Sequence, residues 1–160
     1  MIDELYLQAL DKAYLELKTQ LSNKNAFSNE FECFYAICTM LHWSLDCIER
    51  IWANDKQKYK EFRFANNQLK HNVNIVSLQR VGGGLAIPPQ GIPFGVINAD
   101  NNVTPMLCFP QMEYKWSDIN DSVITDRFAK MQLPEYRTKL VEKSVVDTLT
   151  ALYQDIKNQT

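Results

Sequence analysis

The stretch "EFECFYAICTMLHWSLDCIERIWAN", residues 30–54, decides the fold class of this chain. Apolar residues occupy almost every side of the helix that it would form, and a helix that is apolar all round is enclosed by other elements. Asn29 followed by Glu32 has the spacing of a capping box, which places the helix start here. Ser28 is the other candidate N-cap, but Phe31 stands three residues after it and cannot reciprocate. The stretch therefore predicts the central helix of a bundle.

Three further segments repeat apolar residues at helical spacing, so each would bury one face against this central helix. They are residues 2–21, residues 56–72 and residues 135–159. Pro134 suits the first turn of the last helix, where the missing N–H of proline would be unpaired anyway. Residues 117–132 are of mixed composition and predict a loop with at most one helical turn.

Residues 73–116 differ from the rest of the chain, because they hold all five glycines and five of the six prolines. Such breakers exclude a long helix. The segments "VNIVSLQRV", "PFGVINA" and "TPMLCFPQMEYKW" have the β-branched and aromatic content of strands, and "NADNN" is typical of a turn. The "GGG" run lacks the spacing of a phosphate-binding loop and predicts a flexible hairpin or bulge. We therefore expect two or three short strands here.

Together these segments predict one mainly α domain over residues 1–160: a bundle of four long helices with a small β-rich insertion at 73–116, before the last helix. A chain of 160 residues is long enough to bury a core. The net charge of −2 argues against a protein that coats nucleic acid by charge alone, although a small local RNA site remains compatible with it.

The location that the sequence favours is the cytoplasm. No apolar run reaches the ~18 residues that a membrane helix needs. The first residues, "MIDELYLQALDKAYLELK", begin with acids and lack the basic start and apolar centre of a signal peptide.

No metal or cofactor is expected. A structural zinc site needs about four suitably spaced ligands. The chain has two histidines and no CxxC pair, which predicts free, mostly buried thiols for its four cysteines: Cys33, Cys38, Cys47 and Cys108.

The candidate chemistry lies in the stretch "EFRFANNQLKHN", which ends at Asn72. A helix turns about 100° per residue, so residues four apart form one stripe on its surface. Arg63, Asn67 and His71 form such a stripe. An imidazole transfers protons near neutral pH, a guanidinium holds a phosphate, and an amide orients a substrate oxygen. The three could cleave RNA without a metal, because the 2′-hydroxyl of RNA is itself the nucleophile.

Two interpretations of this stripe stay open at the level of sequence. It could be a reaction centre, with Asn66 and Lys70 in support beside it. It could equally be the solvated face of an ordinary helix, since polar residues at helical spacing are common there.

A second polar stripe, His42, Asp46 and Arg50, lies on the otherwise apolar helix of residues 30–54. An unpaired buried charge is costly, so this stripe needs partners or water. It predicts either a network that packs helices together or, if the two helices are antiparallel neighbours, a second wall of one cleft shared with the Arg63–His71 stripe.

The hexapeptide "NNQLKH" resembles the RNxxxH signature of the HEPN superfamily (higher eukaryotes and prokaryotes nucleotide-binding domains). Asn67 matches the polar second position and His71 the histidine, whereas Asn66 stands where the signature has arginine. Arg63, one turn earlier, could supply the guanidinium instead. The order of "LHWSLDCIERI", "FRFANNQLKHN" and "KSVVDTLTAL" also resembles a group of uncharacterised bacterial proteins with W…LD, LRYARNxxxHQ and RPVxDTL patterns, in which Arg63 matches the first arginine.

This resemblance implies a small helical bundle that cleaves or binds RNA without a metal, in bacterial defence or toxin–antitoxin systems. His71 would be the acid–base group, Arg63 the contact to phosphate or transition state, and Asn67 the orienting amide. HEPN domains typically dimerise with their motifs facing each other, so a homodimer and a protein partner such as an antitoxin are expected. The alternative is a non-catalytic assembly module that uses the same face as a dimer or partner surface.

Overall fold

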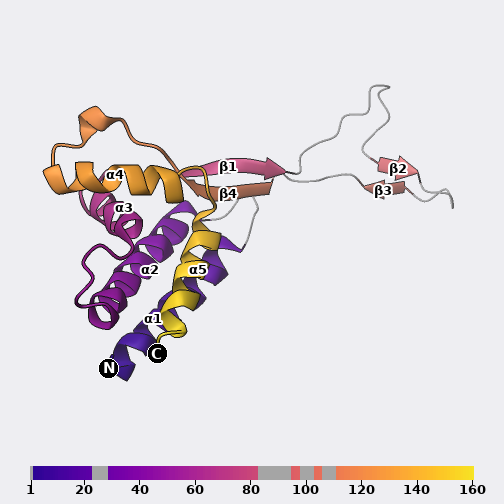
Figure 1. The fold of residues 1–160 in the computed structure, drawn as a ribbon. Helices are drawn as coiled ribbons and strands as arrows, with labels where there is room; N and C mark the ends of the chain where they lie inside the picture. Colours follow the sequence, from indigo (N-terminus) through magenta and orange to yellow (C-terminus); the bar gives the residue numbers. More distant parts are fainter. Residues whose placement is uncertain (1, 23–28, 83–94, 98–102, 106–110) are drawn as a thin grey trace.

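The protein is mainly helical, with a small two-stranded antiparallel sheet beside the helices (Figure 1). The computed structural model describes residues 2–22, 29–82, 95–97, 103–105 and 111–160. In these residues it places five α-helices: α1 (Glu4–Leu21), α2 (Glu30–Ile51), α3 (Lys60–Lys70), α4 (Arg127–Lys139) and α5 (Val145–Lys157). No helix in the described ranges is long and apolar enough to cross a membrane.

The helix α2 is the centre of the molecule, as the sequence predicts. Its start is confirmed, since the Asn29 side chain accepts hydrogen bonds from the backbone N–H groups of Phe31 and Glu32. It packs against α1, α3 and α5, and Figure 1 shows α1 and α5 alongside it with both chain termini at one end. The rings of Tyr14 and Tyr153 stack with centroids 4.0 Å apart, which ties α1 to α5.

In its described residues the β-rich region contains four short strands in two separate pairs, rather than the two or three expected. Strand β1 (Val76–Gly82) pairs antiparallel with β4 (Gln111–Trp116), and β2 (Gly95–Ile97) pairs antiparallel with β3 (Val103–Pro105). The register shifts between Arg80 and Gly82, so the first glycine of the "GGG" run lies at an irregularity of the ladder. The predicted turn at 98–102, the rest of the glycine run and Cys108 lie outside the described residues. Cys38 and Cys47 are free thiols, as expected, and Cys33 is buried.

The prediction of one long last helix is wrong, and with it the bundle of four. Residues 127–132, expected in a loop, belong to the first half of α4, and Pro134 lies inside that helix. The helix is then interrupted between Leu140 and Ser144, and α5 begins at Val145. Figure 1 shows α4 lying across α3, whereas α5 runs back along α1 and α2.

Backbone pairing with the end of β4 explains this break. Glu142 has a left-handed φ of 65°, and its N–H donates to the carbonyl of Trp116 over 2.8 Å. The Trp116 N–H in turn donates to the carbonyl of Lys143. Ser144 then caps α5 by accepting from the Asp147 N–H, which satisfies a donor that the helix start would leave unpaired. Apolar spacing runs through the break, so periodicity alone does not reveal it.

The Trp116 side chain completes this junction. The residue is fully buried, and its indole N–H donates to the Thr148 hydroxyl on α5 over 2.8 Å. The same hydroxyl donates a hydrogen bond to the carbonyl of Ser144. Trp116 therefore ties β4, the break and α5 together.

We expect Thr148→Val to lower the free energy of unfolding by about 1–3 kcal/mol, because the buried indole N–H of Trp116 loses its acceptor. Urea denaturation followed by circular dichroism measures the change. Thr150→Val, on the same helix and partly buried, is the matched control and should stay within about 0.5 kcal/mol of the wild type. Equal losses in the two variants would contradict the role given to this bond.

Candidate functional site

His71 lies at the C-terminal end of α3, exposed to solvent. The following residue, Asn72, adopts a left-handed φ of 60°, which asparagine tolerates better than most residues. The Val73 N–H then reaches back to the Gln68 carbonyl over 3.0 Å, as in a Schellman motif. Helix α3 thus ends at Lys70, two residues before the predicted end at Asn72, and this termination fixes the backbone that carries the imidazole.

The other sides of α3 are buried to an extent that the sequence did not indicate. Phe62 and Ala65 face the core, which suits the apolar spacing of this helix, but Glu61 and Gln68 are buried as well. The carboxylate of Glu61 lies 3.5 Å from the Lys139 ammonium of α4. Helix α3 is therefore held between α2 and α4.

Two hollows open along the α3–α4 contact. The first, the His71 hollow, has a volume of about 270 Å³ and is lined by Asn67, Gln68, His71, Val73, Val123, Ile124, Thr125, Asp126 and Ala129. The second, the Arg63 hollow, has a volume of about 280 Å³ and is lined by Leu45, Glu49, Arg63, Asn66, Asn67, Lys70, Asp126, Phe128, Ala129 and Gln132. Asn67, Asp126 and Ala129 border both hollows, so the two are neighbours.

The predicted Arg63–Asn67–His71 stripe is thus brought to one surface and distributed over these hollows. Asn66 and Asn67 are half-buried and line the contact with α4, which a freely solvated helix face would not do. Lys70 and His71 are exposed. The stripe therefore lines a groove between α3 and α4 and is not simply a solvent-exposed helix face.

Arg63 is already engaged within the protein. Its Nη1 donates to Glu49 of α2 over 2.9 Å, and its Nε donates to the Lys58 carbonyl over 3.2 Å. Only about a fifth of its side chain is exposed. A guanidinium that is paired with a carboxylate has less charge to offer a phosphate, so Lys70 is the more available cation in this groove.

The stripe His42–Asp46–Arg50 does not share a cleft with α3. Arg50 lies over the ring of Tyr6 on α1, with its Cζ 3.5 Å from the centroid, and Asp46 is its ion-pair partner at 3.7 Å. His42 is exposed and packs edge-on against Trp43. The α2 side chain that meets Arg63 is instead Glu49, the residue directly before Arg50. Of the two interpretations of this stripe, the structure supports the packing network.

The wall of the His71 hollow opposite α3 is held by Arg137. Its Nε donates to the Asp118 carboxylate and its Nη2 to the Ile119 carbonyl, both over 2.8 Å, and Asp121 accepts a further bond from it. These bonds fix the segment that leads through a short 3₁₀ helix, Asp121–Val123, to the hollow. The hydrogen bond from Arg137 lowers the pKa of Asp118, because it favours the charged form.

Sequence reasoning missed the α4 side of the groove, since residues 117–132 were expected to form a loop. Asp126 caps α4 by accepting from the Ala129 N–H over 2.7 Å, and Phe128, in the first turn of that helix, is 73% exposed. An aspartate just ahead of a segment with apolar residues at helical spacing is an N-cap signal that the sequence does contain. In the described part of the chain, no group of three or more His, Cys, Asp or Glu residues is placed to hold a metal ion.

Comparison with known proteins does not extend this description. The chain matches no model of a protein family, and curated proteins and solved structures also give no match. Its function therefore has to be argued from the groove itself.

We expect the Asp118 carboxylate to titrate below the ordinary value of 3.8. A carboxylate whose pKa is lowered by folding stabilises the protein above that ordinary value, and the contribution is lost as the pH falls through the lowered pKa. Carboxyl-carbon NMR across an acid titration measures the pKa of Asp118. Arg137→Gln should return the Asp118 pKa towards 3.8, whereas Arg127→Gln, exposed at the start of α4, should leave it unchanged. An unchanged Asp118 titration in Arg137→Gln would contradict the role given to the hydrogen bond between Arg137 and Asp118.

Proposed function

We propose that the protein is a HEPN-like domain that binds RNA in the α3–α4 groove and cleaves it with His71. One observation carries the proposal: Asn67 borders both the hollow lined by the exposed imidazole of His71 and the hollow lined by the exposed ammonium of Lys70. A proton-transfer group, a phosphate contact and an orienting amide are what metal-independent RNA cleavage requires of an enzyme.

The reaction would be a transesterification within the RNA. A base removes the proton of the 2′-hydroxyl, whose oxygen attacks the adjacent phosphorus, and the bond to the 5′-oxygen breaks. The 5′-oxygen takes up a proton, so the products are a 2′,3′-cyclic phosphate and a 5′-hydroxyl. His71 would serve one of these proton transfers, because an imidazole is both acid and base near neutral pH.

The remaining roles differ from those that the family resemblance implies. Asn66 stands at the arginine position of the signature, and Arg63 is bound to Glu49. We therefore assign the phosphate contact to Lys70. Arg63 would serve mainly to hold α3 against α2, and its Glu49 partner keeps it oriented along the groove.

We expect His71→Ala to reduce the rate of RNA cleavage by about 100- to 10,000-fold, the usual contribution of a general acid or base. The assay is a radiolabelled single-stranded RNA digested in the presence of EDTA, with the product ends identified as cyclic phosphate and 5′-hydroxyl. His42→Ala is the matched control, because His42 is the only other histidine and is exposed away from the groove. Equal cleavage by both variants would remove His71 from the reaction.

A second candidate function is assembly without catalysis, in which the same face binds another copy of the chain. Two large apolar side chains of α4, Phe128 and Met131, are 73% and 66% exposed. Exposed apolar groups that lie close together commonly mark protein interaction sites.

For this candidate we expect the wild type to sediment as a dimer and Met131→Lys to sediment as a monomer, because a buried unpaired ammonium is costly at an interface. Leu15→Lys, at a similarly exposed leucine of α1, is the control and should leave the mass unchanged. A wild type that stays monomeric over the whole concentration range would exclude self-assembly as the function of this face.

A further inference from the structure

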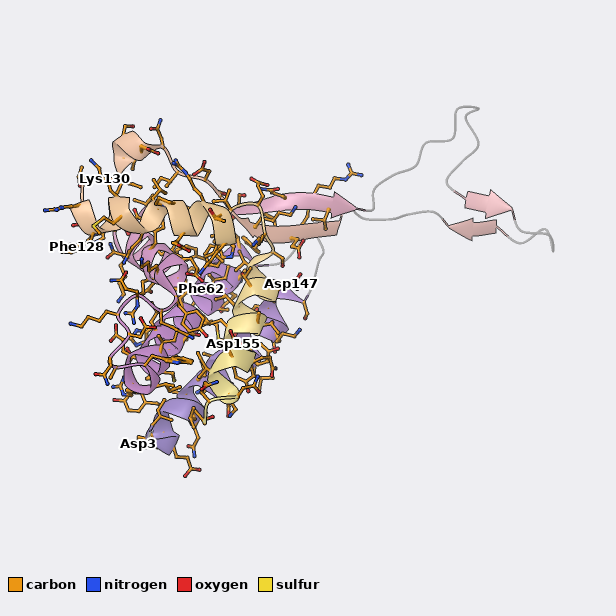
Figure 2. All side chains as sticks on the ribbon, viewed as in Figure 1. Asp3, Phe62, Phe128, Lys130, Asp147 and Asp155 are labelled. Atoms are coloured by element: carbon orange, nitrogen blue, oxygen red, sulfur yellow. The ribbon has the colours of Figure 1, made fainter. Side chains whose placement is uncertain are left out.

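The Arg63 hollow has a feature that the cleavage chemistry does not use. Phe128 is among the most exposed large apolar side chains of the described residues, and it lines this hollow opposite Asn66, Asn67 and Lys70 of α3. Figure 2 shows Phe128 at the end of α4 that lies farthest from β1 and β4. An exposed ring beside two amides and an ammonium is a combination with a definite binding chemistry.

That chemistry is recognition of an unpaired nucleobase. Aromatic side chains bind bases by stacking, and they accept any base because every base has a π face. Side-chain amides donate to and accept from base edges, and Asn66 and Asn67 offer both functions beside the ring. Both amides are half-buried, so they lose less conformational freedom on binding than freely exposed side chains would.

Charge around the hollow favours a polyanion. Its two acidic residues are occupied, since Glu49 pairs with Arg63 and Asp126 caps α4. The exposed cation that lines the hollow is Lys70 of α3. Basic side chains beside a stacking platform are the usual arrangement in proteins that bind single strands.

We infer that the Arg63 hollow binds one base of a single-stranded RNA, stacked on Phe128, with an adjoining phosphate on Lys70. The inference rests on the proposed function and deepens it by naming the substrate class. A base inside a duplex is already stacked and paired, so single strands, loops and bulges are bound and uniform duplex is not. The strand passes from Phe128 over Asn67 to His71 in the neighbouring hollow.

The test measures binding separately from cleavage. The probe is a short 2′-O-methyl uridine oligomer, which has no free 2′-hydroxyl and cannot be cleaved, with the same oligomer annealed to its complement as the duplex comparison. Affinity is read by fluorescence anisotropy of an end label over a range of salt concentrations. The variants are Phe128→Ala, Phe128→Trp, Lys70→Gln and, as the matched control, Phe31→Ala, whose ring on α2 is 68% exposed away from this groove.

We expect Phe128→Ala to weaken single-strand binding on the order of 5- to 150-fold, the range for loss of one stacked base. Phe128→Trp should keep the affinity of the wild type for the single strand, and Phe31→Ala should not change that affinity. The duplex should bind more weakly than the single strand. Lys70→Gln should reduce the slope of log K against log salt by about 0.7, whereas Phe128→Ala should leave that slope unchanged, because the ring contacts no phosphate.

Three results would overturn the inference. Wild-type affinity in Phe128→Ala would remove the stacking site, and if His71→Ala still loses cleavage, the proposed function survives that result. Equal or tighter binding of duplex would contradict the single-strand class. No binding of either probe by the wild type, with Phe128→Ala changing the sedimenting mass, would assign Phe128 to an interface between copies of this chain instead.

Discussion

The junction around Trp116 is the constraint on which the rest of the structure depends. Its backbone pairs with both Glu142 and Lys143, and its buried indole bonds Thr148. These bonds satisfy the polar groups that a break in a helix exposes, which is why an otherwise continuous apolar pattern can end and start again. The break sends α4 across α3 and returns α5 to α1 and α2. Without it the α3–α4 groove would have no second wall.

The groove is open because the two helices are held apart by what they bury. Phe64 of α3 packs against Tyr136 of α4, with ring centroids 4.7 Å apart, and Glu61 meets Lys139 near the same end of α4. Burial raises the pKa of Tyr136, whose hydroxyl donates to the Ser117 carbonyl. These contacts lie towards the C-terminal half of α4. The N-terminal half, with Asp126 and Phe128, therefore borders hollows rather than core.

Much of the helical framework is predictable from the sequence because its signals are local. The cap at Asn29, the apolar surround of α2 and the left-handed end of α3 at Asn72 depend on neighbouring residues alone. The strand content of residues 73–116 follows from composition in the same way. The capping signals at Asp126 and Ser144 are equally local, but the continuous apolar spacing around Leu140 outweighs them in a reading by periodicity.

The sequence by itself determined which residues are chemically able to act: an imidazole, two amides and cations spaced along one helix. Only the tertiary structure decided which of them are available. It pairs Arg63 with Glu49, turns the His42–Asp46–Arg50 stripe towards α1, and sets Phe128 opposite Asn67. The physical reason is that side-chain spacing fixes a direction around one helix, whereas partners and exposure depend on contacts between residues far apart in the chain.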